Sequence, residues 1–136
     1  MKDLHSHLKV SPAINPAAIV NSNGTSTGAT IDTADYYSLE FVVQSGALTD
    51  GTLAISVYHG DASNMSDEAV CAAADLLGDA LSFDGSVSAD DSATKRIGYR
   101  GSKRYVRIKV VQAGASTGGY FCALAIQGHP RVMPVA

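Results

Sequence analysis

The sequence predicts an all-β protein, an antiparallel β-sandwich of the jelly-roll or immunoglobulin-like kind with an extended N-terminal arm. The strongest observation is the alternation of residues 105–110, where Val106, Ile108 and Val110 point one way and polar side chains point the other. Such alternation is typical of a half-buried strand in an antiparallel sheet. Six to eight runs of this kind, separated by short turns, favour a sandwich. The composition agrees, because aromatic residues make up only 7% of the chain and small residues typical of short strands and turns are abundant.

The chain of 136 residues is long enough for one domain with a core of its own. We divide it into an arm and linker at 1–30 and a sandwich at 31–136. Pro12 and Pro16 forbid a regular helix in the arm and favour an extended path. Because its apolar side chains need a surface to cover them, the arm either packs back on its own domain as an edge strand or lies on a neighbouring subunit. The candidate interface residues of the arm are Val10, Ile14, Ile19 and Val20.

Two strands are expected after the linker, at 37–45 and 52–59. In each of them apolar and polar residues alternate, which predicts one buried and one exposed side. The segment between them, GALTDG, has the glycine and aspartate residues of a turn. We therefore interpret the pair as a hairpin or part of a meander.

The segment 66–77 is the one candidate helix. Ser66 would cap it, acidic residues follow in its first turn, and Gly78 would end it. Because the segment is short, a loop with a single helical turn is the alternative. A short strand at 80–83 and an acidic, serine-rich loop at 86–93 come next.

The last three strands are expected at 94–99, 103–112 and 120–127. A Gly-Ser turn separates the first two, and the Gly-rich segment AGASTGG is expected to join the last two as a hairpin connection. The alternation in these runs and in the earlier ones predicts which side chains form the core. The expected core residues are Leu39, Phe41, Val43, Leu53, Ile55, Val57, Val106, Ile108, Val110, Leu124 and Ile126.

Charge is strongly polarised along the chain, although the net charge is only −3. All thirteen acidic residues lie at or before Asp91, where the chain sums to −11, and the remainder sums to +8. Segregated charge of this kind favours docking on oppositely charged groups of a neighbouring chain, and Arg suits bidentate carboxylate pairing. The alternatives are a phosphate-binding strand and a solvated sheet face whose charges prevent edge-to-edge aggregation. The candidate interface residues here are Arg100, Lys103, Arg104 and Arg107.

The composition also argues against several classes of protein. The acidic sum disfavours a general nucleic-acid binder. No apolar run is long enough to span a membrane, and the N-terminus lacks the apolar core of a secretory signal, so we expect a protein made in a cytoplasm. Cys71 and Cys122 are then expected to be reduced thiols, and their spacing does not indicate a metal site.

We tested the catalytic and metal-binding templates against the sequence, and none fits well. His5 and His7 form a pair that lacks a third ligand, and His59 follows a strand without a nucleophile motif nearby. Asp90 and Asp91 are oxygen ligands without the loop spacing of a calcium site. We therefore expect no catalytic residues, no bound metal, no cofactor and no enzymatic activity.

Three parts of the chain carry a resemblance: LHSHLKVSPAINPAA, YYSLEFVVQSGALTDGTLAISVYHGD, and KRIGYRGSKRYVRIKV together with LAIQGHPR. These segments resemble a family of small virion structural proteins of tailed bacteriophages, and the similarity covers nearly the whole chain. The resemblance implies a small β-sandwich, located in the virion and assembled in the host cytoplasm. It further implies a protein that decorates or cements the capsid by bridging neighbouring subunits.

The partners implied by this resemblance are the major capsid protein and other copies of the same chain, with a trimer as the favoured oligomer. A head–tail connector is an alternative, because its gene shares the same neighbourhood in phage genomes. A glycan- or receptor-binding module on the virion is the other alternative, since the strand KRYVRIKV is similar to one strand of galactose-binding-like modules. Neither a membrane nor direct contact with nucleic acid is expected.

Overall fold

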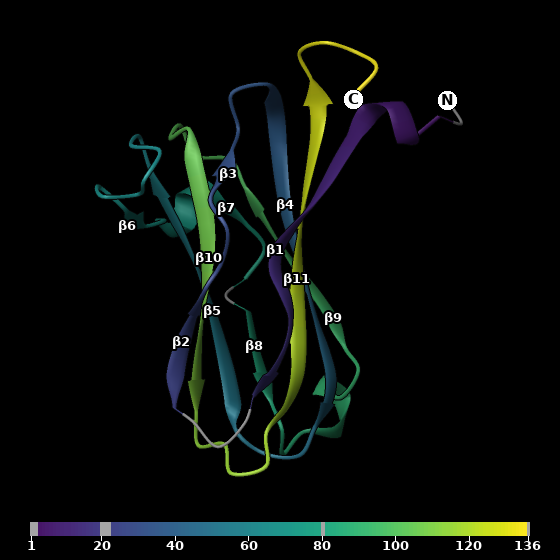
Figure 1. Cartoon of the computed structure of the whole chain (residues 1–136), viewed down its shortest axis with the longest axis vertical. Helices are drawn as coiled ribbons and strands as arrows, with labels where there is room; N and C mark the ends of the chain where they lie inside the picture. The colour runs from purple at the N-terminus through teal and green to yellow at the C-terminus, as the bar shows by residue number, and fades with distance from the viewer. Residues whose placement is uncertain (1–2, 20–22, 80, 136) are drawn as a thin grey trace.

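The computed structural model describes residues 3–19, 23–79 and 81–135, with the side chains of 17–19 excepted. It confirms the predicted all-β class and the sandwich of two antiparallel sheets, which face each other across one core (Figure 1). The first sheet has the order β1 (Leu8–Ile19), β11 (Gly119–Pro130), β4 (Tyr36–Leu48), β9 (Thr94–Tyr99) and β7 (Leu76–Leu77). The second sheet has the order β2 (Gly24–Thr27), β10 (Tyr105–Ala113), β5 (Thr52–Gly60) and β6 (Ala69–Val70), with β3 (Ile31–Asp32) on β10 and β8 (Leu81–Asp84) on β5. Three short 3-10 turns are η1 (His5–His7), η2 (Ala73–Asp75) and η3 (Ser88–Asp90).

Successive long strands cross between the sheets instead of pairing with each other. The expected hairpin between β4 and β5 is wrong, because β4 pairs with β11 and β9 while β5 pairs with β10. The expected hairpin between β10 and β11 is wrong for the same reason, since these strands lie in different sheets. The physical reason is that alternation shows which side of a strand is buried but not which strand lies beside it. A short loop can join two strands within one sheet or arch over the end of a sandwich about 10 Å thick.

The N-terminal arm contributes an edge strand to its own domain, which is the first of the two alternatives for it. Strand β1 pairs with β11 from Leu8 opposite Gly128 to Ile19 opposite Gly119. Two register shifts accompany Pro12 and the segment up to Ala17, as expected because proline cannot donate to a sheet ladder and is confined to edges. Strand β2 joins the second sheet, and the division of the chain at residue 30 stays a prediction. Contact of the arm with a neighbouring chain stays a prediction.

The core lies between the sheets, and the alternation predicted most of it. The expected residues of β4, β5 and β10 are all buried. The prediction for β11 is wrong, because Phe121, Ala123 and Ala125 face the core while Leu124 is 42% exposed and Ile126 only half-buried. The physical reason is that β11 is apolar on both sides, so its alternation does not identify the inner one. The buried cluster consists of Ala13, Ile14, Ile31, Leu39, Phe41, Val43, Leu48, Leu53, Ile55, Val57, Cys71, Phe83, Ile97, Tyr99, Val106, Ile108, Val110, Phe121, Ala123 and Ala125.

The expected helix at 66–77 is not formed, and the segment contains β6, η2 and β7 instead. This is the alternative of a loop with one helical turn. Two tertiary contacts explain the outcome. The Asp67 carboxylate accepts hydrogen bonds from the backbone amides of Asp61 and Ala62, at 2.8 and 3.1 Å, instead of facing a first helical turn. The Cys71 amide donates to the Val57 carbonyl at 2.9 Å, which pulls the chain onto the second sheet.

The turn between β4 and β5 is fastened to the loop between β10 and β11 by a single carboxylate. Asp50 accepts hydrogen bonds from the backbone amides of Ser116, Thr117 and Gly118 and from the Ser116 hydroxyl. These amide donors, Gly118 first, lower the pKa of Asp50 to about 2. The contact holds two crossing loops together at one end of the sandwich.

We predict that Asp50→Asn lowers the melting temperature at pH 7 and flattens its acid dependence. The folded-state pKa of Asp50 lies below its ordinary value of 3.8, so its contribution is full above that value and is lost as the pH falls toward about 2. Thermal unfolding between pH 7 and pH 2 measures this. Asp35→Asn is the control, because we find no amide contact to that exposed carboxylate among the described residues. Equal acid dependence in wild type and Asp50→Asn would contradict the prediction.

Candidate interaction surfaces

The outer face of the second sheet carries a partly buried cluster of charged side chains, which we name the charged face. Arg107 and Lys109 project outward from β10, and both bind the carboxylate of Glu68. The Arg107 Nε–Glu68 Oε2 distance is 2.7 Å, and the three side chains are only 19–20% exposed. The Lys109 ammonium also lies 4.3 Å from the centre of the Tyr58 ring. Hydrogen bonds from Lys109 first, and then from Arg107, hold the pKa of Glu68 below its ordinary value.

The other predicted basic residues also have partners within the same chain. Arg104 binds Asp32 in a bidentate pair, with both N–O distances at 2.8 Å, and Lys103 binds Asp61. These partners come from segments earlier in the sequence, which the fold places beside β10. Intramolecular pairing therefore accounts for the charge polarity that suggested a neighbouring chain. The role of these residues in an interface stays a prediction.

Arg100 differs from the other three basic residues. Its Nε donates to the Ala74 carbonyl at 2.8 Å, and among the described residues it forms no ion pair. It lies at the end of β9, beside the first sheet. The predicted basic residues are thus divided, with Arg104 and Arg107 tied to the second sheet and Arg100 at the border of the first.

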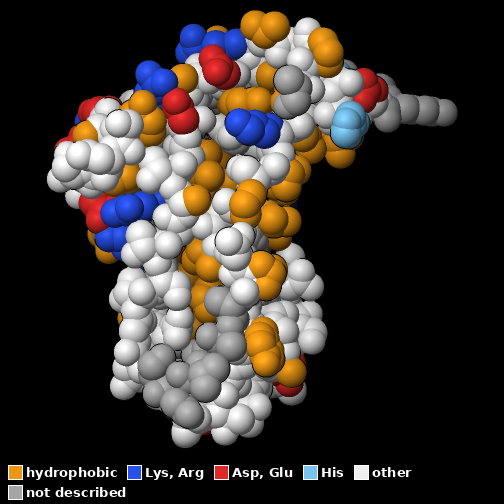
Figure 2. Space-filling model, viewed as in Figure 1, with side chains coloured by type: hydrophobic (Ala, Val, Ile, Leu, Met, Phe, Trp, Pro, Cys, Tyr) orange, Lys and Arg blue, Asp and Glu red, His pale blue; other side chains and the backbone are white. Residues whose placement is uncertain are grey.

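The outer face of the first sheet is apolar, and we name it the apolar face. It is formed by side chains from four strands that point away from the core: Val10, Val42, Leu77, Leu124 and Ile126. Val10, Leu77 and Leu124 are 56%, 52% and 42% exposed. In Figure 2 hydrophobic side chains run along β1 and beside it, whereas Lys and Arg gather on the side formed by β10 and its neighbours. The two outer faces of the sandwich therefore differ in chemistry.

The four predicted residues of the arm are separated by the fold. Val10 lies on the apolar face, opposite Ile126 of β11, whereas Ile14 is buried in the core at 9% exposure. The backbone of Ile19 ends β1, but its side chain and the whole of Val20 lie outside the described residues. Sequence reasoning missed Leu124 and Ile126 as surface residues, because it placed them in the core.

A shallow groove of about 540 Å³ continues the apolar face toward the end of the sheet where β11 ends. Leu8, Leu77 and Ile126 line it together with polar groups that include Glu40 and His129. His129 has a positive φ of 50°, which is uncommon for residues other than glycine. Its Nδ1 lies 2.9 Å from the Ser38 hydroxyl. The groove is large enough for a small ligand.

His59 and Cys71, which the sequence analysis considered for catalysis or metal binding, have structural roles in the described part of the chain. His59 Nδ1 lies 3.0 Å from the Tyr99 hydroxyl, which also accepts the Lys103 amide at 3.0 Å and so fixes the turn before β10. Burial raises the pKa of Tyr99 to about 12. Burial likewise raises the pKa of Cys71 to about 12, so this thiol stays protonated and is a poor nucleophile. The absence of enzymatic activity stays a prediction.

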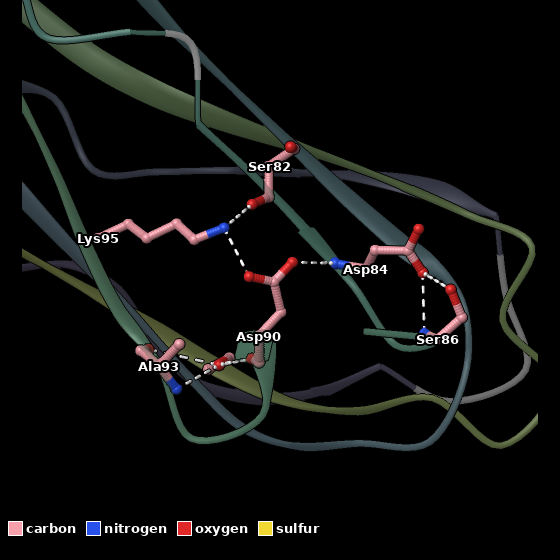
Figure 3. A network of polar contacts seen from close by, with 7 residues as sticks. Ser82, Asp84, Ser86, Asp90, Ala93 and Lys95 are labelled. Atoms are coloured by element: carbon pink, nitrogen blue, oxygen red, sulfur yellow. Dashed lines mark hydrogen bonds and ion pairs between the residues drawn. The ribbon is translucent and has the colours of Figure 1, made fainter. Parts of the chain in front are cut away.

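Two carboxylates in or next to the acidic loop before β9 have hydrogen-bond or ion-pair partners within the loop and its flanking strands (Figure 3). Asp90 binds the Lys95 ammonium at 2.7 Å and accepts the Asp84 amide at 2.9 Å. The Ser86 hydroxyl donates to Asp84 at 2.7 Å. Within 3–16, 23–79 and 81–135 no three His, Cys, Asp or Glu side chains come together as metal ligands. The network stabilises the loop, and the absence of a bound metal stays a prediction.

None of the described segments forms a helix long and apolar enough to cross a membrane.

Comparison with known proteins indicates a related fold but does not show a family. No protein-family model and no curated protein sequence matches the chain. The PBSX exported protein XepA has a TM-score of 0.56 and 17% identity, over 100% of this chain and 41% of XepA. The structure of infectious bursal disease virus, Gx strain, has a TM-score of 0.46 and 12% identity, over 93% of this chain and 34% of that chain. The structure of PirA has a TM-score of 0.41 and 14% identity, over 95% of this chain and 99% of PirA.

The likeness to XepA shows that the two chains share a sandwich fold, at an identity too low to indicate a common function. This chain spans less than half of XepA. The other two likenesses are too loose to carry an argument. Fold and surface together define a β-sandwich protein with one charged and one apolar outer face.

Proposed function

We propose that this protein is a structural protein of the virion of a tailed bacteriophage, which decorates or cements the capsid. The observation that carries the proposal is the exposed apolar face, because the largest apolar patch on a soluble protein, typically about 300–600 Å², is often functional. Such a face supports a role in assembly with other chains. The groove beside it holds the Ser38 hydroxyl 2.9 Å from the His129 Nδ1 atom, and the absence of enzymatic activity stays a prediction.

The sequence resemblance supplies the virion context of the proposal. Its segments correspond to β1, β4, β5, β9, β10 and most of β11, which are the long strands of both sheets. The resemblance therefore extends through the whole sandwich and includes the strands of both outer faces. XepA supports the same reading at the level of the fold only.

The proposed role is mechanical. A cement protein bridges neighbouring subunits of the major capsid protein, so that the shell resists opening under internal pressure. The rigid sandwich suits this task, since its loops are fastened by carboxylates such as Asp50 and Asp90. Arg100 and the charged residues around β10 are the proposed contacts with the capsid.

The copy number per particle tests the proposal. Quantitative mass spectrometry of purified phage particles should find this chain in many copies, in a fixed ratio to the major capsid protein. A copy number that corresponds to one ring per particle would instead identify a head–tail connector. Absence of the chain from purified particles would overturn the virion role.

A glycan- or receptor-binding module is the second candidate, and the groove is the observation that favours it. Its rim combines Tyr37, which is 73% exposed, with polar groups such as Glu40 and Arg100. Binding of the purified protein to a glycan array, lost in Tyr37→Ala and retained in Val111→Ala, would favour this candidate. Val111 is a suitable control because it lies on the opposite face, on β10.

A further inference from the structure

Strand β11 is apolar on both of its sides over a continuous stretch. The run Tyr120–Ile126 contains only apolar and aromatic residues. Phe121, Ala123 and Ala125 face the core and are at most 2% exposed. A strand with this continuous pattern is typical of a sheet that is covered on both faces. The second sheet covers the inner side, and no described residue covers the outer side at Leu124.

The strand register shows that the apolar face is contiguous. Directly opposed residues of antiparallel strands project to the same side. One row joins Val10 of β1 to Ile126 of β11, and the next joins Pro12, Leu124 and Val42 across three strands. The first row continues to Glu40 of β4 and the second to Arg96 of β9, so the uncharged part of the face is formed by β1, β11 and Val42 of β4.

A glycine extends the face toward the opposite edge of the sheet. A Cβ atom at Gly98 would lie 3.1 Å from the Leu77 Cβ and 2.9 Å from Glu40 Oε2. These contacts show that Leu77 and Glu40 sit on the same outer face, close to the backbone of β9. The face therefore reaches β7, the last strand of the sheet.

The few charges on this face are balanced. Glu40 of β4 and Arg96 of β9 project to it, with the Arg96 Nε and Glu40 Oε1 atoms 3.7 Å apart. Arg96 is 78% exposed, so most of its guanidinium is available to another carboxylate. A neutral face with one group of each sign does not select a strongly acidic or basic partner. It is complementary to a second copy of itself.

We propose that the apolar face is a self-association surface, on which a second copy of this chain docks through a two-fold axis. The two first sheets then stack face to face about 10 Å apart, as sheets do inside a sandwich. The interface is isologous, and an axis that passes between Glu40 and Arg96 brings Glu40 of each copy to Arg96 of the partner copy. The two-fold dimer differs from the trimer that the sequence resemblance favours. This inference concerns the protein alone in solution and does not depend on a role in the virion.

The size of the face sets the expected strength of association. Five strands about 4.8 Å apart and about 20 Å long give a face on the order of 400 Å². A standard stable interface buries about 800 Å² on each partner. The apolar face therefore supplies the centre of an interface, and we expect a dimer that dissociates on dilution in the micromolar range.

The first experiment measures molar mass by sedimentation over a range of concentrations. We expect wild type to shift from the 14.0 kDa of one chain to twice that mass as the concentration rises. Leu124→Lys and Val10→Lys place a charge on the apolar face and should remain monomeric. Val111→Lys is the matched control, because Val111 is 44% exposed, as Leu124 is at 42%, but lies on the other sheet. It should associate as wild type does.

Three results would overturn the proposal. The first is a wild type that stays monomeric up to millimolar concentration. The second is association that persists in folded Leu124→Lys and Val10→Lys, with folding checked by thermal unfolding. The third is association that Val111→Lys abolishes while the two apolar-face variants retain it. Each of these outcomes leaves the copy number in the virion unaffected, so failure here is distinct from failure of the proposed function.

A native thiol gives a second, independent measurement. Cys122 lies on the outward side of β11, two residues from Leu124, whereas Cys71 is buried at 6% exposure. Labelling by a thiol reagent under native conditions therefore reports on Cys122. By mass action we expect it to slow on the order of tenfold when the protein is about fifty-fold above its dissociation constant. Equal labelling rates in dilute and concentrated wild type, or slowing that Leu124→Lys retains, would contradict face-to-face docking.

Discussion

Ile108→Ala is expected to lower the free energy of unfolding by about 2–5 kcal/mol, through lost transfer energy and the cavity that remains. Ile108 lies on β10, near the centre of the second sheet, and is fully buried. Its neighbours come from both sheets, so the surrounding side chains cannot collapse into the space without moving a strand. Urea unfolding at pH 7, followed by far-ultraviolet circular dichroism, measures the change.

Val111→Ala on the same strand is the control for this prediction. Val111 points outward and is 44% exposed, so its truncation is expected to change the free energy of unfolding by no more than about 0.5 kcal/mol. A loss below about 0.5 kcal/mol for Ile108→Ala would show that the residue is not in the core. Equal losses for the two variants would show that the register of β10 differs from the one described.

The inward sides of β4, β5 and β10 could be predicted from the sequence because each strand has one polar and one apolar side. Phe41, Ile55 and Ile108 are buried as the alternation indicated. The same signal failed on β11, where Leu124 and Ile126 were assigned to the core. Both sides of that strand are apolar, and the sequence of a single strand contains no information about which side the second sheet covers.

Strand pairing could not be predicted from the sequence, and this limited the prediction of the candidate surfaces. The turn around Asp50 and the segment AGASTGG have hairpin chemistry, yet both connections cross between sheets. Pairing depends on distant segments, such as β1 docking on β11 across more than a hundred residues. Without that pairing, the placement of Val10 beside Ile126 was not accessible, and neither was the contiguous apolar face.

The charge polarity of the chain was visible in the sequence, but its partners were not. Arg104 and Arg107 were expected to bind carboxylates of a neighbouring chain, and that contact stays a prediction. The carboxylates that they bind in the structure are Asp32 and Glu68 of the same chain. Intramolecular pairs form at high effective concentration once the fold is made, so polarity along a sequence does not by itself distinguish a partner chain from the chain's own earlier segments.

Glu68→Gln is expected to lower the free energy of unfolding at pH 7 by about 1–3 kcal/mol, because it leaves two cations of the charged face without a counter-charge. Arg107 and Lys109 are only 20% and 19% exposed, so water replaces the lost carboxylate incompletely. Glutamine keeps the shape of the side chain and one acceptor oxygen, which places the loss below that of a complete truncation. Urea unfolding of both proteins measures the difference, with Asp61→Asn as a control in an exposed pair expected to cost about 0–1 kcal/mol.

The difference between wild type and Glu68→Gln should depend on pH in one direction. The pKa of Glu68 in the folded protein lies below its ordinary value of 4.5, chiefly because Lys109 donates to it. The carboxylate therefore contributes its full stabilisation above pH 4.5 and loses it as the pH falls through the folded-state pKa. We expect the two unfolding free energies to be furthest apart near pH 7 and to converge below pH 4.5. A difference that stays constant down to pH 3 would mean that Glu68 acts through its shape and packing, and that the ion pairs on the charged face contribute little to folding.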